Sequence, residues 1–497
     1  MKQPLDMLII GGGINGTGIA LDAAGRGLSV ALCEMHDLAS ATSSASSKLI
    51  HGGLRYLEQF EFRLVREALA ERETLLQAAP HIIWPLRFRL PHQPHLRPAW
   101  MIRLGLWLYD HLARRDRLPG SHMLPLNGAG PLQPHLGRIF EYSDAWVDDA
   151  RLVVLCAMAA QERGAHIWPR TRCTQARRKN GLWHIELIRE NGSLSTVTAR
   201  VLVNAAGPWV SHLFEEVLPS PPPARLRLVK GSHIVVPRLH DGGEAYILQN
   251  QDGRIIFVLP YEQDYSLIGT TDIDYTGDPG CVAPSYEEIT YLCDVVNTHF
   301  TRQIEPNEVI HRFSGVRPLM ADSRGQAQQA SRDYKLLLST DSHQTAPLLS
   351  VFGGKITTFR ALAEDALNQL TAFLPPNDGP WTTHLVLPGG DFEDHASLAG
   401  SLKQEYPWLP HRLVQRYVRS YGTLCRQFLN RHAGITDLGE HFGAGLYAAE
   451  VDYLMDQEWA HTTDDVLWRR TKLGLHLTPE QQRQLDAYMQ QALQHNG

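Results

Sequence analysis

A glycine-rich turn near the N-terminus constrains the fold of this chain more than any other feature. The apolar run Met7–Ile10 leads directly into Gly11-Gly12-Gly13-Ile14-Asn15-Gly16, and a second apolar run, Leu28–Cys33, ends at Glu34. A strand, a glycine turn, a helix, a strand and a carboxylate follow one another in the order of a dinucleotide-binding βαβ unit. We therefore expect a doubly wound α/β domain at this end of the chain.

Each glycine of the turn has its own physical task. Gly11 permits the tight turn, Gly13 lets the backbone approach a pyrophosphate at the positive end of the helix, and Gly16 lets the helix pack closely on the sheet. Glu34 is expected to accept hydrogen bonds from the ribose. The bare pattern is common by chance, but here a helix expected over 17–24 ends at further glycines, as helices often do.

Length, charge and cysteine content narrow the class of protein. The 497 residues allow roughly two or three domains, and 47 basic against 53 acidic side chains argue against nucleic acid as a partner. The six cysteines show no metal-ligand spacing, which predicts a reducing, cytosolic compartment and no metal site. No run approaches the roughly 18 apolar residues of a spanning helix. The first strand leaves no room for a leader peptide, so we expect any membrane contact to be peripheral.

The middle of the chain changes from buried-strand to alternating patterns. Short alternating runs separated by glycine turns predict an inserted antiparallel sheet. The expected strands are Leu226–Pro237, Glu244–Gln249, Arg254–Tyr261 and Tyr265–Thr271.

The pattern of buried strand, glycine turn and helix returns after this insertion. Leu348–Phe352 precedes Gly353-Gly354 and a helix expected over Phe359–Phe373, while prolines and glycines over 375–390 predict a linker. The fold class we expect is α/β (α+β overall), with a Rossmann-like cofactor domain, an inserted antiparallel sheet and an all-helical C-terminal domain. The expected bounds are 1–90, 141–220 and 310–385 for the discontinuous cofactor domain, 91–140 and 221–309 for the substrate or cap domain, and 388–497 for the helical domain.

The segment Trp100–Tyr109 has two interpretations. It combines apolar and aromatic residues, and arginines follow at positions 114, 115 and 117. Such a segment fits a helix lying on anionic lipid. It also fits a buried helix with solvated ends, which the residues alone favour because apolar stripes usually belong to a core.

Several long strings are specific enough to carry a family resemblance. They are the glycine turn, the serine-rich run 39–48, His51-Gly52-Gly53-Leu54-Arg55-Tyr56, Trp146–Leu152, Lys230-Gly231-Ser232-His233, Gly353–Thr358 and Leu467–Lys472. Together they resemble the bacterial, aerobic, quinone-linked family of FAD-dependent glycerol-3-phosphate dehydrogenases over essentially the whole chain. The resemblance implies hydride transfer from C2 of sn-glycerol 3-phosphate to FAD, which gives dihydroxyacetone phosphate, and passage of the electrons to ubiquinone.

The resemblance also implies which residues contact FAD. The serine-rich run is expected to form a loop around the cofactor, and the later glycines to pack against it. The implied cofactor-binding residues are Gly11, Gly13, Gly16, Glu34, Thr42, Ser43, Ser47, Leu49, His51, Gly207, Gly353, Gly354 and Thr357.

The substrate needs cations for its phosphate and a base for its hydroxyl proton. Arginine forks bind tetrahedral anions through paired hydrogen bonds, and the resemblance places Arg55 and Arg317 near the flavin, with Tyr56 beside Arg55. Lys355, directly after Gly353-Gly354, is expected to be catalytic and substrate-binding, as a fixed positive charge that stabilises the anionic reduced ring or binds substrate oxygens. Thr271 is expected to hydrogen-bond the substrate on resemblance alone.

Two histidines are candidates for the proton transfer, because a histidine titrates near neutral pH. We expect His233 to act as the base and His51 to lie on the flavin side, both as catalytic residues.

The expected partners follow from the resemblance. They are sn-glycerol 3-phosphate, ubiquinone, an anionic membrane surface at the inner face of the cell membrane and a second copy in a homodimer, with no nucleic acid. Three alternatives stay open: a glycerol-3-phosphate oxidase using oxygen, an amine oxidase of the same fold, and a non-catalytic FAD-binding membrane protein.

Overall fold

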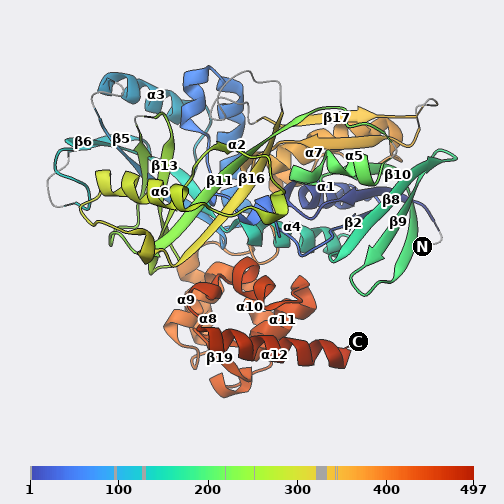
Figure 1. Cartoon of the computed structure of the whole chain (residues 1–497). Coiled ribbons are helices and arrows are strands. Elements are labelled where there is room, and N and C mark those ends of the chain that lie inside the picture. The colour runs from blue at the N-terminus through green and yellow to red at the C-terminus, as the bar shows by residue number, and fades with distance from the viewer. Residues whose placement is uncertain are drawn as a thin grey trace.

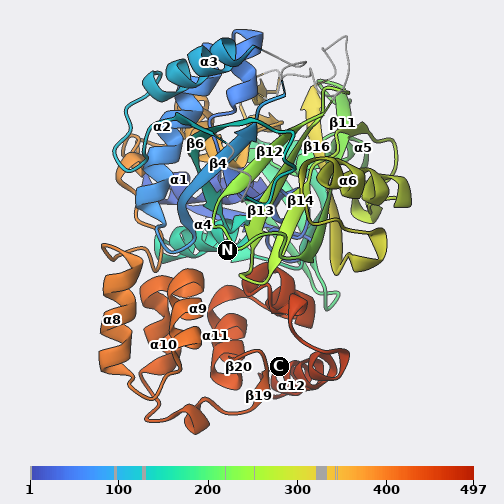
Figure 2. The same cartoon turned by 90° about the vertical axis from the view of Figure 1, so that its left-hand side faces the viewer.

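Two large sheets and a C-terminal layer of helices make up the molecule (Figure 1). The computed structural model describes residues 3–93, 98–125, 130–218, 220–250, 252–320, 333–341, 343 and 345–496, apart from the side chains at positions 55, 59 and 496. The C-terminal helices lie beneath both sheets, while α3 lies at the opposite end of the molecule in both views (Figures 1 and 2).

The first sheet is the expected cofactor-binding sheet. Its strands run in the order β17-β18-β10-β1-β2-β7, with parallel pairing from β18 to β7. This order places the carboxyl ends of β1, β10 and β18 side by side, where a ligand binds in such sheets. The bounds are β1 Leu5–Ile10, β2 Val30–Cys33, β7 His166–Trp168, β8 Thr171–Lys179, β9 Leu182–Arg189, β10 Leu194–Asn204, β17 Lys335–Ser339 and β18 Leu348–Phe352.

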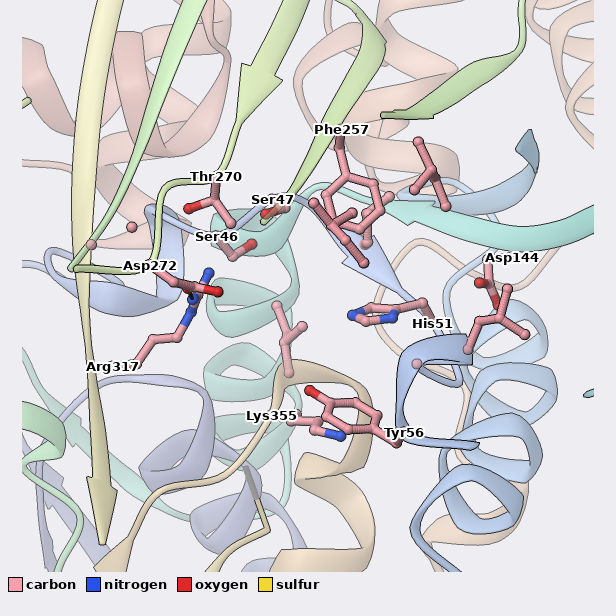
Figure 3. A pocket seen from close by; sticks show the side chains of 18 of the residues that line it. Ser46, Ser47, His51, Tyr56, Asp144, Phe257, Thr270, Asp272, Arg317 and Lys355 are labelled. Atoms are coloured by element: carbon pink, nitrogen blue, oxygen red, sulfur yellow. Dashed lines mark hydrogen bonds and ion pairs between the residues drawn. The ribbon is translucent and has the colours of Figure 1, made fainter. Parts of the chain in front are cut away.

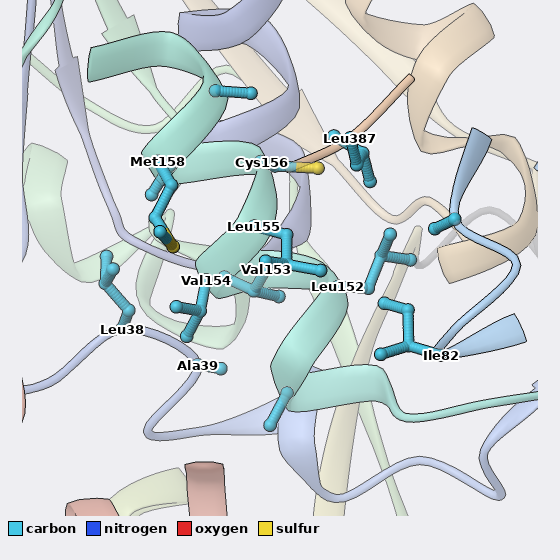
Figure 4. Packing of buried hydrophobic residues seen from close by; sticks show 14 of the residues in the cluster. Leu38, Ala39, Ile82, Leu152, Val153, Val154, Leu155, Cys156, Met158 and Leu387 are labelled. Atoms are coloured by element: carbon cyan, nitrogen blue, oxygen red, sulfur yellow. The ribbon is translucent and has the colours of Figure 1, made fainter. Parts of the chain in front are cut away.

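Alternation along β1 sends side chains to two cores. Met7 and Ile9 face the helices α1 (Ile14–Gly25), α4 (Asp149–Glu162) and α7 (Phe359–Leu370), whereas the intervening Leu8 faces β8, β9 and α5 (His212–Glu216). Figure 4 shows α4 buried among neighbours from several segments. Since both faces are covered there, the parallel strands β1, β2 and β18 are mainly apolar.

The second sheet contains the four strands expected in the insertion, but it is larger than predicted. Its order is β15-β11-β14-β13-β12-β4-β6-β3, with β16 on β11 and β5 on β6. β4, β6 and β16 were expected largely in the cofactor domain but pair here, and β4 pairs with β12 in parallel. The bounds are β3 Leu49–Ile50, β4 Ile83–Pro91, β5 His122–Pro125, β6 Arg138–Val147, β11 Leu226–Pro237, β12 Ala245–Gln249, β13 Ile255–Tyr261, β14 Tyr265–Gly269, β15 Ile273–Asp274 and β16 His311–Met320, and helix α6 Tyr286–His299 packs on this sheet.

The C-terminal domain is mostly helical, but the all-helical prediction needs a correction. A short hairpin of β19 (His441–Gly443) and β20 (Leu446–Tyr447) interrupts it, because glycines with positive φ at 443 and 445 permit a tight turn. The helices are α8 His395–Glu405, α9 His411–Tyr421, α10 Cys425–Leu429, α11 Ala448–Glu458 and α12 Pro479–Asn496, with a π-helix at Asp465–Arg470.

Helix α3 (Ala99–His111) is not a buried helix, so that interpretation is wrong. Trp100 is 66% exposed, Leu104 50% and Trp107 52%, whereas Leu106 and Tyr109 face the second sheet and α2 (Phe62–Ala78). The exposed side chains form one apolar face of Trp100, Met101, Leu104 and Trp107, which we call the α3 face. In the part of the chain that the structure describes, no helix has the length and apolarity needed to cross a bilayer.

Candidate active site

The glycine turn has the geometry that its sequence predicts. Gly11 has φ +117°, and a Cβ there would lie 2.4 Å from the Ala205 carbonyl oxygen. A Cβ at Gly16 would lie 1.9 Å from the Gly11 carbonyl oxygen. Because no side chain tolerates such contacts, the turn, β10 and α1 approach one another only with glycine at these positions.

Glu34 lies against this turn, as predicted for the ribose-binding acid. Its two carboxylate oxygens accept hydrogen bonds from the Gly12 amide at 2.7 Å and from the His36 amide at 2.9 Å. Burial raises the pKa of its carboxyl, an effect that the two amides partly offset. Each oxygen keeps a lone pair for a ribose hydroxyl.

A pocket extends from Ile14, at the start of α1, to the second sheet, and nine of the nineteen predicted site residues line it (Figure 3). They come from the serine-rich loop, the segment after β3, β16 and the turn after β18, which lie far apart in sequence. The predicted residues that line the pocket are Thr42, Ser43, Ser47, Leu49, His51, Tyr56, Arg317, Gly354 and Lys355.

The serine-rich loop links the two sheets. The Ser43 hydroxyl accepts a hydrogen bond from the Ile14 amide at 3.0 Å, and the Thr42 hydroxyl donates to the Val316 carbonyl at 2.7 Å. The loop is therefore fixed to the first turn of α1 and to β16 at the same time. A Cβ at Gly13 would lie 3.0 Å from the Ser43 hydroxyl, so the loop also closes over the glycine turn.

The remaining predicted cofactor residues support the pocket from behind or lie beside it. Gly353 and Gly354 have φ of +77° and +103°, and the Gly353 carbonyl accepts a hydrogen bond from Asn15 at 3.0 Å. The buried Thr357 hydroxyl accepts from the His51 amide at 3.3 Å. Gly207, with φ +56°, follows Ala205 and Ala206 and is not among the lining residues.

Cationic groups reach the pocket from two sides. The Arg317 guanidinium forms an ion pair with Asp272, and the Lys355 ammonium lies 4.0 Å above the Tyr56 ring. Figure 3 shows the arginine pair on one side of the pocket and Lys355, Tyr56 and His51 on another. The side chain of Arg55, the second predicted arginine, lies outside the described residues.

The two predicted histidines have different environments. The His51 ring lines the pocket (Figure 3), whereas His233 is 1% exposed and stacks on Phe313 with ring centres 4.9 Å apart. A ring nitrogen of His233 lies 3.0 Å from the Ser47 hydroxyl. Burial, with nearby Arg317 and Lys48, holds the pKa of His233 well below its usual value. His233 is therefore buried behind the residues that line the pocket.

Thr271 does not face the pocket, and its neighbour Thr270 does. The Thr271 hydroxyl is fully buried, accepting from the Ser232 amide at 3.0 Å and donating to Glu288 at 2.9 Å. The buried Thr270 hydroxyl lines the pocket and has no hydrogen-bond partner among the described residues. Asp272 also lines the pocket, whereas Thr271 between them does not. The three residues lie between β14 and β15, outside both strands, so strand alternation offers no signal for Thr270 or Asp272.

The site fits a dinucleotide with a ring system at its far end. The glycine turn leaves space only for backbone, the pocket begins at Ile14 within that turn segment, and the Thr270 hydroxyl lacks a partner within the described chain. Phe257 and Ile247 add apolar surface from the second sheet, which suits a ring. Among the described residues no group of three metal-ligating side chains occurs.

Comparison with known proteins agrees with this fit. The family described as FAD dependent oxidoreductase matches residues 6–360, and the C-terminal domain of alpha-glycerophosphate oxidase matches 380–495. Glycerol-3-phosphate dehydrogenase of Pseudomonas aeruginosa is 57% identical and covers 99% of this chain and 96% of its own. Aerobic glycerol-3-phosphate dehydrogenase of Escherichia coli is 53% identical and covers 97% of each chain. D-erythritol 1-phosphate dehydrogenase of Brucella abortus is 51% identical and covers 96% of each.

Solved structures show the same fold. Glycerol-3-phosphate dehydrogenase from Bacillus halodurans complexed with FAD has a TM-score of 0.76 at 26% identity and covers 98% of this chain and 95% of its own. L-alpha-glycerophosphate oxidase from Mycoplasma pneumoniae, with a TM-score of 0.60 at 18% identity, covers 78% of this chain and 99% of its own. The cofactor is therefore FAD, and the chain belongs to the FAD-dependent oxidoreductases, within the bacterial glycerol-3-phosphate dehydrogenase family.

Proposed function

We propose that this protein oxidises sn-glycerol 3-phosphate to dihydroxyacetone phosphate. The observation that carries the proposal is the pocket itself, which begins at Ile14 beside the dinucleotide turn and gathers Arg317, Lys355 and His51 in its lining. A phosphorylated alcohol needs cations for its phosphate and an acceptor for its hydroxyl proton, and this pocket supplies both. Bound FAD supplies the acceptor for the hydride that leaves C2.

The cationic residues have different roles, according to the side of the pocket on which they lie. Lys355, stacked over Tyr56, supplies a fixed charge for the phosphate, together with Arg55. Arg317 is held by Asp272 on the other side of the pocket. There its guanidinium would stabilise the negative charge on the C2 oxygen of the substrate. The Thr270 hydroxyl, which lines the same side, orients the alcohol. These contacts fix the substrate for transfer.

His51 is better placed than His233 to take the hydroxyl proton. Its ring lines the pocket, whereas His233 is buried behind Ser47 and its low pKa makes it a weak base. In this proposal His233 positions the Ser47 hydroxyl through their 3.0 Å contact.

Replacement of His51 separates the two histidines kinetically. For His51→Gln we expect kcat to fall about 100-fold, as for loss of a general base, and the acidic limb of the pH profile of kcat/KM to disappear. His233→Gln keeps an amide that can still bond Ser47, so we expect a smaller fall and an intact acidic limb. An acidic limb that survives in His51→Gln and vanishes in His233→Gln would assign the base to His233.

The substrate is tested by reduction of the bound flavin without oxygen. The FAD-loaded protein is mixed anaerobically with sn-glycerol 3-phosphate, D-erythritol 1-phosphate or glycine, and loss of flavin absorbance is followed. We expect sn-glycerol 3-phosphate to bleach the flavin fastest. Faster bleaching by D-erythritol 1-phosphate would identify that ester as the preferred substrate. Bleaching by glycine would indicate an amine oxidase. No bleaching by any of the three would refute an enzymatic function for this pocket.

The electron acceptor and the location belong to the same proposal. We propose that the protein binds the inner face of the cell membrane through the α3 face, as a homodimer, and passes electrons to ubiquinone. The α3 face and exposed Arg103, Arg114 and Arg117 support lipid contact, because apolar side chains beside cations bind anionic interfaces. Reoxidation by a quinone analogue should outpace reoxidation by oxygen, and sedimentation in detergent measures the dimer.

Charges placed on the α3 face should release the protein from lipid. For the double variant Leu104→Glu/Trp107→Glu we expect most binding to vesicles of phosphatidylglycerol and phosphatidylcholine to be lost, because two carboxylates must be desolvated beside anionic lipid. Co-sedimentation at low salt measures the bound fraction. The matched control is Leu194→Glu, at a 76% exposed apolar residue of β10. If both variants bind the vesicles equally well, the lipid contact does not involve the α3 face.

A further inference from the structure

Two family strings have no part in the proposed chemistry, and the structure brings them together. Trp146–Leu152 ends in the first turn of α4, which packs on the cofactor sheet. Leu467–Lys472 begins within the π-helix of the C-terminal domain and ends two residues after it. Their meeting point lies where the C-terminal layer covers the first sheet (Figure 1). The contacts there are charged and buried.

The first contact is an arginine fork on Asp37. Both terminal nitrogens of Arg470 donate to the two Asp37 oxygens at 2.8 Å, and Arg469 donates to the same carboxylate at 2.6 Å. Asp37 is 2% exposed and Arg470 is fully buried. A buried bidentate pair has a strict geometry and leaves an uncompensated charge when one partner is removed.

Asp37 belongs to the segment that encloses the glycine turn. Glu34 accepts from the Gly12 amide, and the Ala39 amide donates to the Gly12 carbonyl at 3.0 Å. The segment 34–39 therefore binds both sides of one residue of the turn, and Asp37 lies between those two bonds. Arginines of the C-terminal domain hold the middle of this segment.

A second contact connects the C-terminal domain to the serine-rich loop. The Lys472 ammonium donates to Asp148 at 2.8 Å, and the adjacent Asp149 accepts from Lys48 and from the Ser46 hydroxyl, both at 2.7 Å. Ser46 lines the pocket within the serine-rich loop. Through the pair Asp148–Asp149, the C-terminal domain is connected to the loop that closes over the cofactor.

We infer that the C-terminal domain is a positioning element for FAD, in which Arg469, Arg470 and Lys472 hold the two FAD-binding loops from outside. None of the three lines the pocket, so they are positioning residues rather than catalytic ones. FAD affinity should therefore depend on charges that never contact the cofactor. Removing a buried charge of the fork releases segment 34–39, which then holds the glycine turn less firmly and weakens FAD binding.

The test compares FAD affinity in full-length variants. For Arg470→Met we expect the dissociation constant of FAD, measured by titrating apoprotein and following flavin fluorescence, to rise about tenfold, a coupling usual within one salt-bridge network. The matched control is Arg416→Met, which breaks the ion pair of the partly buried Arg416 with the buried Glu450 at 2.6 Å inside the C-terminal domain. The control should lower the melting temperature but leave FAD affinity unchanged.

Further variants keep the test decisive. Arg470→Lys retains the charge but not the fork, so it should weaken FAD binding even where Arg470→Met does not fold, and Lys472→Met tests the second contact. The inference is overturned if Arg470→Lys and Lys472→Met bind FAD within twofold of the unmodified protein, or if Arg416→Met weakens FAD binding as much as they do. Because no substrate is present, this outcome is independent of the proposed reaction.

Discussion

Replacement of Arg317 by methionine is expected to lower kcat/KM for sn-glycerol 3-phosphate by about 1000-fold, as for loss of a fixed donor to a reacting oxygen. Arg317 lies on β16, lines the pocket and is oriented by Asp272. Its guanidinium is thus in place before the substrate binds and needs no reorganisation during the reaction. Methionine preserves the length of the side chain but removes the charge and every donor.

Steady-state kinetics with a quinone analogue measures this effect, and flavin absorbance shows whether FAD is retained. The control is Arg312→Met, at an exposed position of the same strand, which should change kcat/KM little. If kcat/KM falls by less than tenfold in Arg317→Met, Arg317 does not stabilise the reacting oxygen. A loss that comes with FAD release would instead assign it to cofactor binding.

The parts of the site that the sequence predicts best depend on local sterics. Gly11 and Gly16 are required because backbone atoms lie within 2.4 Å and 1.9 Å of where a Cβ would be. The turn, the acid after β2 and the helix between them are also contiguous in sequence. A requirement of this kind is visible in one short string, so Glu34 could be placed beside the turn without knowledge of the rest of the fold.

The parts that the sequence predicts poorly depend on long-range pairing. β16 joins β11 although positions 238–310 lie between them in the sequence. No local pattern indicates that β4, β6 and β16 belong to the second sheet. His233 and Thr271 belong to segments that border the pocket, but both side chains are buried outside it, because the direction of a side chain depends on which neighbours cover the strand. The α3 face is likewise exposed because no other described residues cover it, and a local sequence pattern does not contain this information.

Replacement of Gly16 by alanine should abolish FAD binding. The added Cβ would lie 1.9 Å from the Gly11 carbonyl oxygen and 3.5 Å from the Ala205 Cβ. The first contact is with backbone, which cannot rotate away, so α1 must move out from the turn. Movement of its N-terminus withdraws the amides that bind the pyrophosphate. We expect purified Gly16→Ala to be colourless and to show no flavin fluorescence change on titration with FAD.

Gly137→Ala is the matched control, because a Cβ at this exposed glycine contacts nothing within 4 Å. It should retain yellow colour and wild-type FAD affinity. Circular dichroism distinguishes a folded apoprotein from an unfolded one, and the prediction requires that Gly16→Ala keep its helical signal while losing FAD. A yellow Gly16→Ala protein would show that the turn can open without loss of the pyrophosphate site, and the assignment of the cofactor to this turn would then be wrong. Since the arginine fork on Asp37 and the serine-rich loop both act through the same turn, that result would also remove the basis for positioning by the C-terminal domain.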